Sequence, residues 1–304
     1  MRIKLPCKRY RFKTILFLSV TLLLHVFAMA SQAETSQSVF WAIEKDGKPA
    51  GYLLGTIHSE DPRVLEYTDE FLEKLRSNEV FAMEMVPDLP TLARLTEYMH
   101  YPKGITLESV IGSERFNALV SALADYNVPR DFITAMKPWA AMMTLSTPPP
   151  ETGFFMDLSL SLRASGSGLK VVGLETLEQQ LSFLQDMPMA MQLSLLDQAI
   201  AASGQVGEAH DRMLEAYLEN NLAHLQALSE DEFQAIGIDE RDYFFTEGIV
   251  TRNRRMLESL LPHLDSSSVF VAVGALHLPG DGGLLNLLRQ NGYQLKPQDV
   301  PFVN

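Results

Sequence analysis

Short runs of β-branched and apolar residues alternate along the chain with longer stretches in which apolar residues recur at helical spacing. Near the start, two β-prone runs, 39–44 and 51–57, flank residues 45–50, whose Asp-Gly and Pro predict a hairpin turn. Residues 67–78 follow with the apolar spacing of a helix, and residues 79–84 with the length of a buried strand. This order of strand, helix and strand predicts a βαβ unit.

Helical patterns dominate the rest of the chain, but three further strand patterns interrupt them. Strands that alternate with helices predict an α/β fold with a mainly parallel central sheet and helices on both faces. Residues from about 179 to 242 carry no strand pattern, and we expect them to form a large helical insert packed over the sheet. The further helices are expected at 114–126, 132–145, 154–164, between 177 and 264, and at 283–290, and the further strands at 169–174, 268–273 and 293–296.

The first 33 residues do not fit this globular pattern. A head with six Lys and Arg residues precedes an apolar run over residues 14–30, and small residues at 28–30 and 31–33 each fit a signal-peptidase site. We therefore predict a signal peptide at 1–33 and a hydrolase-type domain at 34–304, exported to the periplasm or secreted. Because the run is shorter than the ~20 residues of a transmembrane helix, cleavage is favoured over the alternative, a retained membrane anchor.

Charge and cysteine content narrow the function classes. Loss of the basic head takes the formal net charge from −13 to −19, and so acidic a surface argues against a nucleic-acid partner. The only cysteine, Cys7, lies in that head. The mature chain would therefore have no thiol nucleophile and no cysteine metal ligand, and it would touch a membrane only if the N-terminal segment is retained.

Four residues with reactive side chains lie where predicted strands end. His58 and His277 each close a Gly-x-x-His sequence after a strand, and Glu84 and Glu175 also lie at strand ends. In open α/β sheets, ligands bind outside the carboxyl ends of the strands. If the strands that lead to His58 and Glu84 are neighbours, these two side chains share one crevice, and His277 joins them only if its strand is also central.

Two imidazoles and a carboxylate are ligand types that suit a divalent metal, so His58, Glu84 and His277 form a candidate metal site. A bound metal lowers the pKa of its water toward ~7, and a nearby carboxylate can accept the proton. Such a site hydrolyses amides or esters without a protein nucleophile. The residues alone leave a structural interpretation open. In that interpretation, each histidine caps a helix or donates to a buried carbonyl, and Glu84 is exposed at a strand end.

Four more residues are candidates for supporting the site. Asp157 and Glu175 each lie beside strongly apolar sequence and are expected to act as a helix cap, a partner for a histidine or a ligand. Arg252 and Asn253 open a predicted helix, with Asn253 central on its apolar face. An inward-facing Arg252 can bind a carboxylate or stabilise an oxyanion, but an arginine cluster on a helix is more often solvated, and the residues alone favour that interpretation.

These residues together resemble the TraB/GumN family, which is related to the TIKI metalloproteases and the pheromone-shutdown proteins. The resemblance runs from about Phe40 to the C-terminus. We could derive no physical role for one matching piece, Lys137-Pro138-Trp139. The matching pieces, in order, are Tyr52–His58, Glu84, Lys137–Trp139, Asp157, Gly173–Thr176 with Gln179, Arg252-Asn253, and Val273–Gly280 with Gly283–Leu285.

The resemblance implies an α/β fold shared with erythromycin-esterase-like proteins and an active site formed by His58, Glu84, Arg252 and His277. It implies manganese or cobalt as the cofactor, to which the ligand types add zinc as a candidate, and a peptide or small molecule as the substrate. A metal-dependent hydrolase, most simply a peptidase, is the function we expect. Two alternatives stay open, namely a non-catalytic protein that sequesters a peptide or signal, and a metal-independent esterase with a histidine base.

Overall fold

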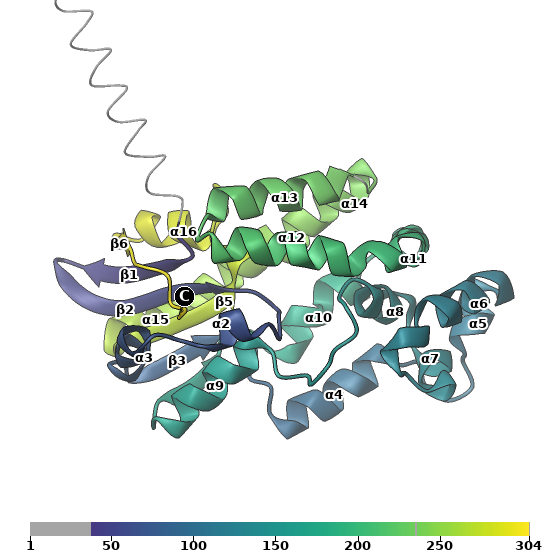
Figure 1. Ribbon diagram of the computed structural model, residues 1–304, viewed down its shortest axis with the longest axis horizontal. Helices are drawn as coiled ribbons and strands as arrows, with labels where there is room; N and C mark the ends of the chain where they lie inside the picture. The colour runs from purple at the N-terminus through teal and green to yellow at the C-terminus, as the bar shows by residue number, and fades with distance from the viewer. Residues whose placement is uncertain (1–37, 235, 304) are drawn as a thin grey trace, which may run out of the picture.

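A computed structural model of the chain describes residues 38–234 and 236–303, so the predicted signal peptide lies outside the described residues. Across the described ranges, no helix combines the length and the apolar character needed to cross a bilayer. One sheet with the strand order β4-β3-β5-β2-β1-β6 forms the centre of one end of the molecule (Figure 1). Its strands are β1 (Phe40–Lys45), β2 (Lys48–Thr56), β3 (Val80–Met83), β4 (Lys170–Gly173), β5 (Val269–Gly274) and β6 (Tyr293–Pro297).

The sheet is mainly parallel, as the sequence predicts. Strands β2, β5, β3 and β4 run parallel to one another, and β1 is antiparallel to both β2 and β6. The predicted hairpin joins β1 to β2 through Asp46 and Gly47, whose φ angles of 52° and 72° are those of a tight hairpin turn. The predicted βαβ unit is present with one difference, because β5 lies between β2 and β3.

Helices cover both faces of the sheet. The side chains of successive strand residues point to opposite faces of the sheet, so Phe40 lies on one face and Trp41 on the other. Phe40 packs edge-on against Phe71 of α3 (Asp69–Arg76), with ring centroids 5.2 Å apart. The guanidinium of Arg289, on α16 (Leu284–Gln290), lies 5.7 Å from the Trp41 ring. The α/β fold with helices on both faces is therefore confirmed.

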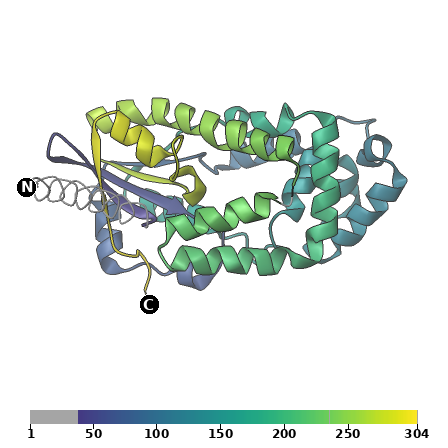
Figure 2. The same cartoon turned by 90° about the horizontal axis from the view of Figure 1, so that it is seen from above.

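A second apolar core, built by helices alone, lies at the other end of the elongated molecule (Figure 2). Helices from the predicted insert share this core with α5 to α8, which come earlier in the chain, so an insert over about 179–242 stays a prediction. The remaining helices are α2 (Pro62–Leu65), α4 (Leu89–Met99), α5 (Leu107–Ile111), α6 (Ser113–Ala122), α7 (Arg130–Ala135), α8 (Pro138–Leu145), α9 (Met156–Gly166), α10 (Leu177–Gln185), α11 (Met189–Ala202), α12 (Val206–Leu218), α13 (Leu222–Gln234), α14 (Ile238–Tyr243) and α15 (Arg252–Ser266), with a π-helix, η3 (Phe244–Thr251), and 3-10 turns η1 (Ala124–Tyr126), η2 (Ser203–Gln205) and η4 (Ala275–His277).

The Lys137-Pro138-Trp139 sequence has a structural role in this second core. The backbone amide of Lys137 donates to the carbonyl of Met99, 2.8 Å away, which ties the start of α8 to the end of α4. Pro138 occupies the first turn of α8, where its missing N–H costs nothing. Trp139 is buried in the apolar cluster. The expected single helix over 132–145 is consequently two helices that break at this sequence.

Candidate functional site

The carboxyl ends of four parallel strands meet at one edge of the sheet, and a candidate residue follows each of them. In spatial order these residues are Glu175 after β4, Glu84 after β3, His277 after β5 and His58 after β2. Because β5 separates β2 from β3, the strands leading to His58 and Glu84 are not neighbours, so the condition under which we expected these two side chains to share a crevice is not met. The neighbours of Glu84 are instead His277 and Glu175.

Glu84 accepts hydrogen bonds at both carboxylate oxygens. The amide of Gly274 donates to Oε1 at 2.8 Å, while Arg252 Nη2 and Gln180 Nε2 donate to Oε2 at 2.6 and 3.1 Å. Burial raises the pKa of Glu84, but the positive charges of protonated His277 and of Arg252 and the Gly274 hydrogen bond outweigh burial and lower that pKa to about 2. Glu84 is therefore ionised at any ordinary pH.

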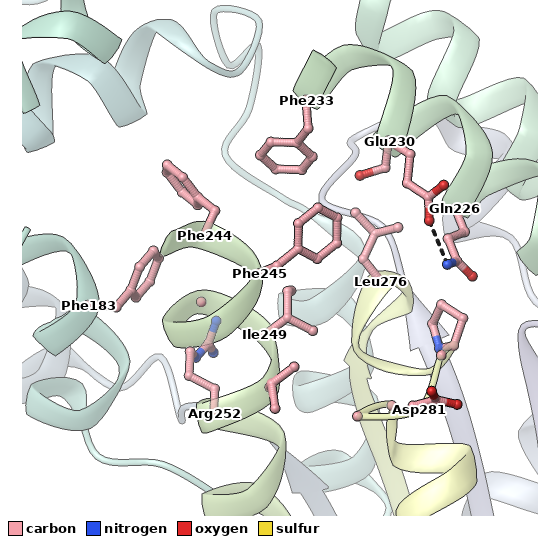
Figure 3. A pocket seen from close by; sticks show the side chains of 17 residues that line it. Phe183, Gln226, Glu230, Phe233, Phe244, Phe245, Ile249, Arg252, Leu276 and Asp281 are labelled. Carbon is pink, nitrogen blue, oxygen red and sulfur yellow. Dashed lines mark hydrogen bonds between the residues drawn. The ribbon is translucent and has the colours of Figure 1, made fainter. Parts of the chain in front are cut away.

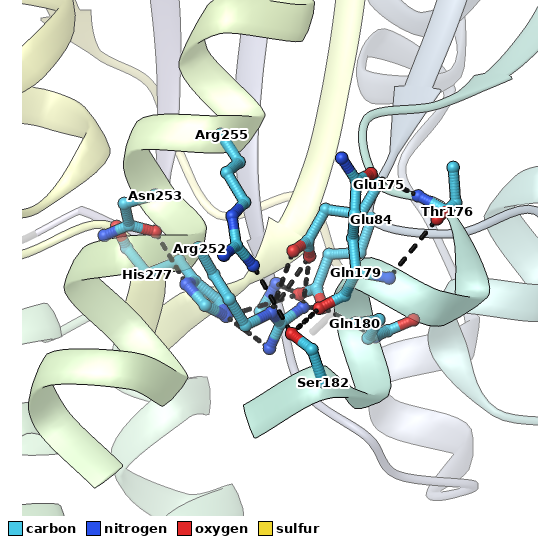
Figure 4. A network of polar contacts seen from close by, with 11 residues as sticks. Glu84, Glu175, Thr176, Gln179, Gln180, Ser182, Arg252, Asn253, Arg255 and His277 are labelled. Atoms are coloured by element: carbon cyan, nitrogen blue, oxygen red, sulfur yellow. Dashed lines mark hydrogen bonds and ion pairs between the residues drawn. The ribbon is translucent and has the colours of Figure 1, made fainter. Parts of the chain in front are cut away.

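Arg252 is buried between two carboxylates, which corrects the solvated interpretation (Figure 4). Its Nε and Nη2 donate to Glu175 Oε2 at 2.9 and 2.6 Å, and Nη2 also reaches Glu84. The Glu175 side chain is fully enclosed, and its burial raises the pKa of its carboxyl group, against the opposing effect of Arg252. A charge buried to this degree is tolerated only when it is paired, so the three residues depend on one another.

His277 has a defined tautomer because Asn253 is held in one orientation. Asn253 Nδ2 donates to the carbonyl oxygens of His277 and Gly282, at 3.1 and 2.8 Å, so its Oδ1 must accept from His277 Nδ1 at 2.6 Å. The unprotonated Nε2 then faces Glu84 Oε1 at 3.8 Å and Arg252 Nη1 at 3.4 Å. Burial lowers the pKa of His277 to about 4, against the opposing effect of Glu84, so the imidazole is neutral at pH 7.

His58 has different neighbours. Its ring stacks on Phe155 with centroids 3.8 Å apart, its Nδ1 lies 3.8 Å from Asp157 Oδ2, and its side chain is 58% exposed. Asp157, in the first turn of α9, is held by a 2.6 Å hydrogen bond from Thr56 Oγ1. The structure thus brings together Glu84 and His277 with their supporting residues, and it places His58 with Asp157.

A divalent metal suits the donor atoms that Glu84 and His277 present, although the set is incomplete. Within the described ranges, no group of three or more His, Cys, Asp or Glu residues is arranged to hold a metal. Two ligand atoms that share one ion at about 2.1 Å each lie roughly 3 to 3.5 Å apart, which is close to the 3.8 Å between Glu84 Oε1 and His277 Nε2. A third ligand from His58 requires its exposed ring to turn away from Phe155.

The glycines of the two Gly-x-x-His sequences allow neighbouring atoms to approach the backbone closely. They do not adopt a φ angle that requires glycine. A Cβ on Gly274 would lie 3.2 Å from Glu84 Oε1, the atom to which its own amide donates. A Cβ on Gly55 would lie 2.8 Å from the Cα of Ala275, in the other motif. Each glycine therefore lets neighbouring strand ends pack closely.

Gln180 belongs to the site but carries no signal of its own in the sequence. Thr176 and Gln179 form a reciprocal capping box, with hydrogen bonds of 3.2 and 2.8 Å, and this Thr-x-x-Gln pattern marks the start of α10. The box positions the first turn of α10 so that Gln180 reaches Glu84. The sequence thus reveals where the helix begins, whereas the contact with Glu84 depends on strand order.

Metal-free protein is expected to lose stability as the pH falls from about 6.5 to 4. The pKa of His277 drops from its ordinary 6.5 to about 4 on folding, so between these values the unfolded chain binds a proton that the folded chain does not. Stability therefore rises with pH across this window, by about 3 kcal/mol for this shift. Urea unfolding in EDTA at pH 4 to 7 measures the effect. His277→Asn should flatten it, and an equally steep fall in that variant would refute the assignment.

Comparison with known proteins gives one family and several distant relatives. The model of the TraB/PrgY/gumN family matches residues 39–297. "Metalloprotease TIKI2" of Danio rerio is 24% identical over 322 residues, which cover 88% of this chain and 62% of the relative. "Metalloprotease TIKI2" of Xenopus tropicalis is 24% identical, covering 86% and 60%. The chain thus spans about three fifths of the length of these relatives. No solved structure is significantly similar to it.

Proposed function

Since the chain belongs to the TraB/PrgY/gumN family, we propose that it is a metal-dependent hydrolase that cleaves peptide segments. Distant relatives that are named metalloproteases support hydrolytic chemistry of this kind. The observation that carries the proposal is the pair formed by ionised Glu84 and the unprotonated Nε2 of His277, which face each other at adjacent strand ends. The proposed place of action, the periplasm or the cell exterior, rests on the signal-like residues 1–33.

Glu84, His277 and, after rotation of its ring, His58 would hold the metal, for which manganese, cobalt and zinc are the candidates. When bound, such an ion supplies a water of lowered pKa and polarises a carbonyl group. Two neighbouring residues hold these ligands in place and in the required protonation state. Arg252 keeps Glu84 ionised and fixed, and Asn253 keeps the proton of His277 on Nδ1 so that Nε2 stays available.

With both carboxylates ionised, the buried cluster also carries one surplus negative charge. Glu84 and Glu175 contribute two negative charges and Arg252 one positive charge, while His277 is neutral at pH 7. A cation at Glu84 would offset the remaining charge, which is costly in a partly buried position. Charge balance thus supports a metal here for the state in which Glu175, whose pKa is raised by burial, is ionised.

A metal-independent hydrolase is the second candidate, because Arg252 already lies against both Glu84 and His277. Its guanidinium could stabilise an oxyanion while Nε2 of His277 accepts a proton. General bases are most effective when their pKa lies near the working pH. A pKa of about 4 makes His277 a weak base at pH 7 and favours its role as a ligand.

Removal and return of metal should decide between these candidates. We expect purified protein lacking residues 1–33 to cleave members of a peptide mixture, to lose at least 100-fold in rate after EDTA treatment, and to recover with manganese, cobalt or zinc. Mass spectrometry of the products measures this, and His224→Ala, at an exposed histidine, is the matched control. Undiminished cleavage in EDTA would favour the metal-independent hydrolase. Tight peptide binding without cleavage under any condition would favour a sequestering protein.

A further inference from the structure

An aromatic pocket of about 300 Å³ adjoins the polar cluster (Figure 3). Four phenylalanines from three separate elements surround it, and Arg252 lies on its wall. Leu276 and residues 279–283, which flank His277 in sequence, complete the lining. The pocket is therefore continuous with the proposed reaction centre. The four phenylalanines are Phe183 of α10, Phe233 of α13, and Phe244 and Phe245 of η3.

The π-helix η3, which runs directly into Arg252, supplies several lining residues, among them Phe244, Phe245 and Gly248. Wide helical turns of this type are frequently found at functional sites. Gly248, in the middle of η3, leaves space that a side chain would fill, because a Cβ there would lie 3.3 Å from Phe183 Cε2 and 3.7 Å from Phe244 Cδ1. The same helix thus carries Arg252 and shapes the hollow beside it.

The four phenylalanines give the pocket a largely apolar wall. Phe183 and Phe244 meet edge to face, with centroids 5.8 Å apart, and Phe233 and Phe245 lie 5.4 Å apart. The charge of Arg252 is already neutralised by its two carboxylate partners. The lining also contains polar side chains: Gln226 donates to Glu230 at 2.8 Å, and Asp281 is a second carboxylate. A large apolar side chain that enters the aromatic part would bury surface against the four phenylalanines.

We propose that this pocket selects substrates by binding one large apolar side chain, aromatic or leucine-like, next to the bond that is cleaved. The inference rests on the proposed function and adds a substrate class to it. Leu276 lines the pocket and is joined directly to His277, so a peptide bond placed at the polar cluster brings a neighbouring side chain to the pocket. Loss of well-packed apolar contact in such a pocket changes discrimination by roughly 10- to 200-fold.

The cleavage profile tests this directly. In wild-type protein we expect bonds beside Phe, Tyr, Leu or Met to be cleaved preferentially in a peptide mixture. Phe233→Ala should reduce kcat/KM for a Phe-containing peptide relative to its Ser-containing analogue by at least 10-fold. Gly248→Ala, which narrows the pocket, should shift the preference toward smaller side chains. Leu162→Ala, which truncates an exposed leucine on α9, is the control and should keep the wild-type profile.

Binding of short peptides to the pocket can be measured without catalysis. In EDTA, we expect Gly-Phe-Gly-amide to displace the neutral fluorescent probe N-phenyl-1-naphthylamine at a concentration at least 10-fold lower than Gly-Ser-Gly-amide, and we expect this difference to vanish in Phe233→Ala. Equal displacement by both peptides overturns the pocket assignment even if peptides are cleaved. Selective displacement without any cleavage would support the pocket while refuting the proposed function.

Discussion

Arg252→Ala should lower the free energy of unfolding by about 3–5 kcal/mol, the usual cost of removing one partner from a buried ion pair. The variant leaves Glu84 and Glu175 next to each other without their shared cation, and the Glu175 side chain has no exposure to water. Urea denaturation at pH 7 measures the loss. Arg254→Ala, at an exposed neighbouring position of the same helix, is the matched control and should change stability by less than about 0.5 kcal/mol.

The pH dependence of the Arg252→Ala variant identifies the cause. Without Arg252, the pKa values of Glu84 and Glu175 should rise, so protonation at mildly acidic pH should recover part of the lost stability relative to wild type. The free energy of unfolding of Arg252→Lys should lie between those of wild type and Arg252→Ala. A single ammonium group cannot reproduce the guanidinium fork that reaches both carboxylates. A loss below 1 kcal/mol for Arg252→Ala would mean that the buried pairing is not important for stability.

Glu84→Gln should reduce kcat/KM for peptide cleavage by about 10²–10⁴-fold, the range expected when a group that carries proton transfer or charge stabilisation is removed. Glutamine can still accept the Gly274 hydrogen bond, so the strand ends should keep their packing. It cannot supply a negative charge to a metal or to Arg252. Loss of activity with only a modest change in thermal unfolding is therefore the expected combination.

The matched control for Glu84→Gln lies at the other end of β3. Glu79 immediately precedes β3 at its amino end and is exposed, whereas Glu84 follows β3 at its carboxyl end. Glu79→Gln removes the same charge from the opposite edge of the sheet and should leave kcat/KM unchanged. If Glu84→Gln cleaves peptides as fast as Glu79→Gln does, Glu84 takes no part in the reaction.

The local elements of the fold could be predicted from the sequence, whereas the order of strands could not. The hairpin, the strands and most helices follow from apolar spacing and turn residues. The strand order depends on β5, which begins at Val269 and inserts between β2, which ends at Thr56, and β3, which begins at Val80. No periodicity encodes that insertion, and it is the insertion that makes His277, and not His58, the neighbour of Glu84.

Arg252 and the aromatic pocket show a second limit of local patterns. Arg252 lies in an arginine-rich sequence that favours solvent exposure, and its carboxylate partners are 77 and 168 positions away. Only the TraB/GumN resemblance, now confirmed by the family match, pointed to it. The π-helix over Phe244–Thr251 has apolar residues that a helical pattern explains equally well as core, so its pocket left no signal in the sequence.

Whether Glu84 and His277 hold one divalent metal is tested most directly by titrating cobalt into metal-free protein and recording its visible absorption, which depends on the ligand set. We predict that wild type and His224→Ala develop the same bands and saturate at one equivalent, and that Glu84→Gln and His277→Ala show no bands at the same concentrations. Bands in His277→Ala identical to those of wild type would contradict this assignment and show that any bound metal lies elsewhere.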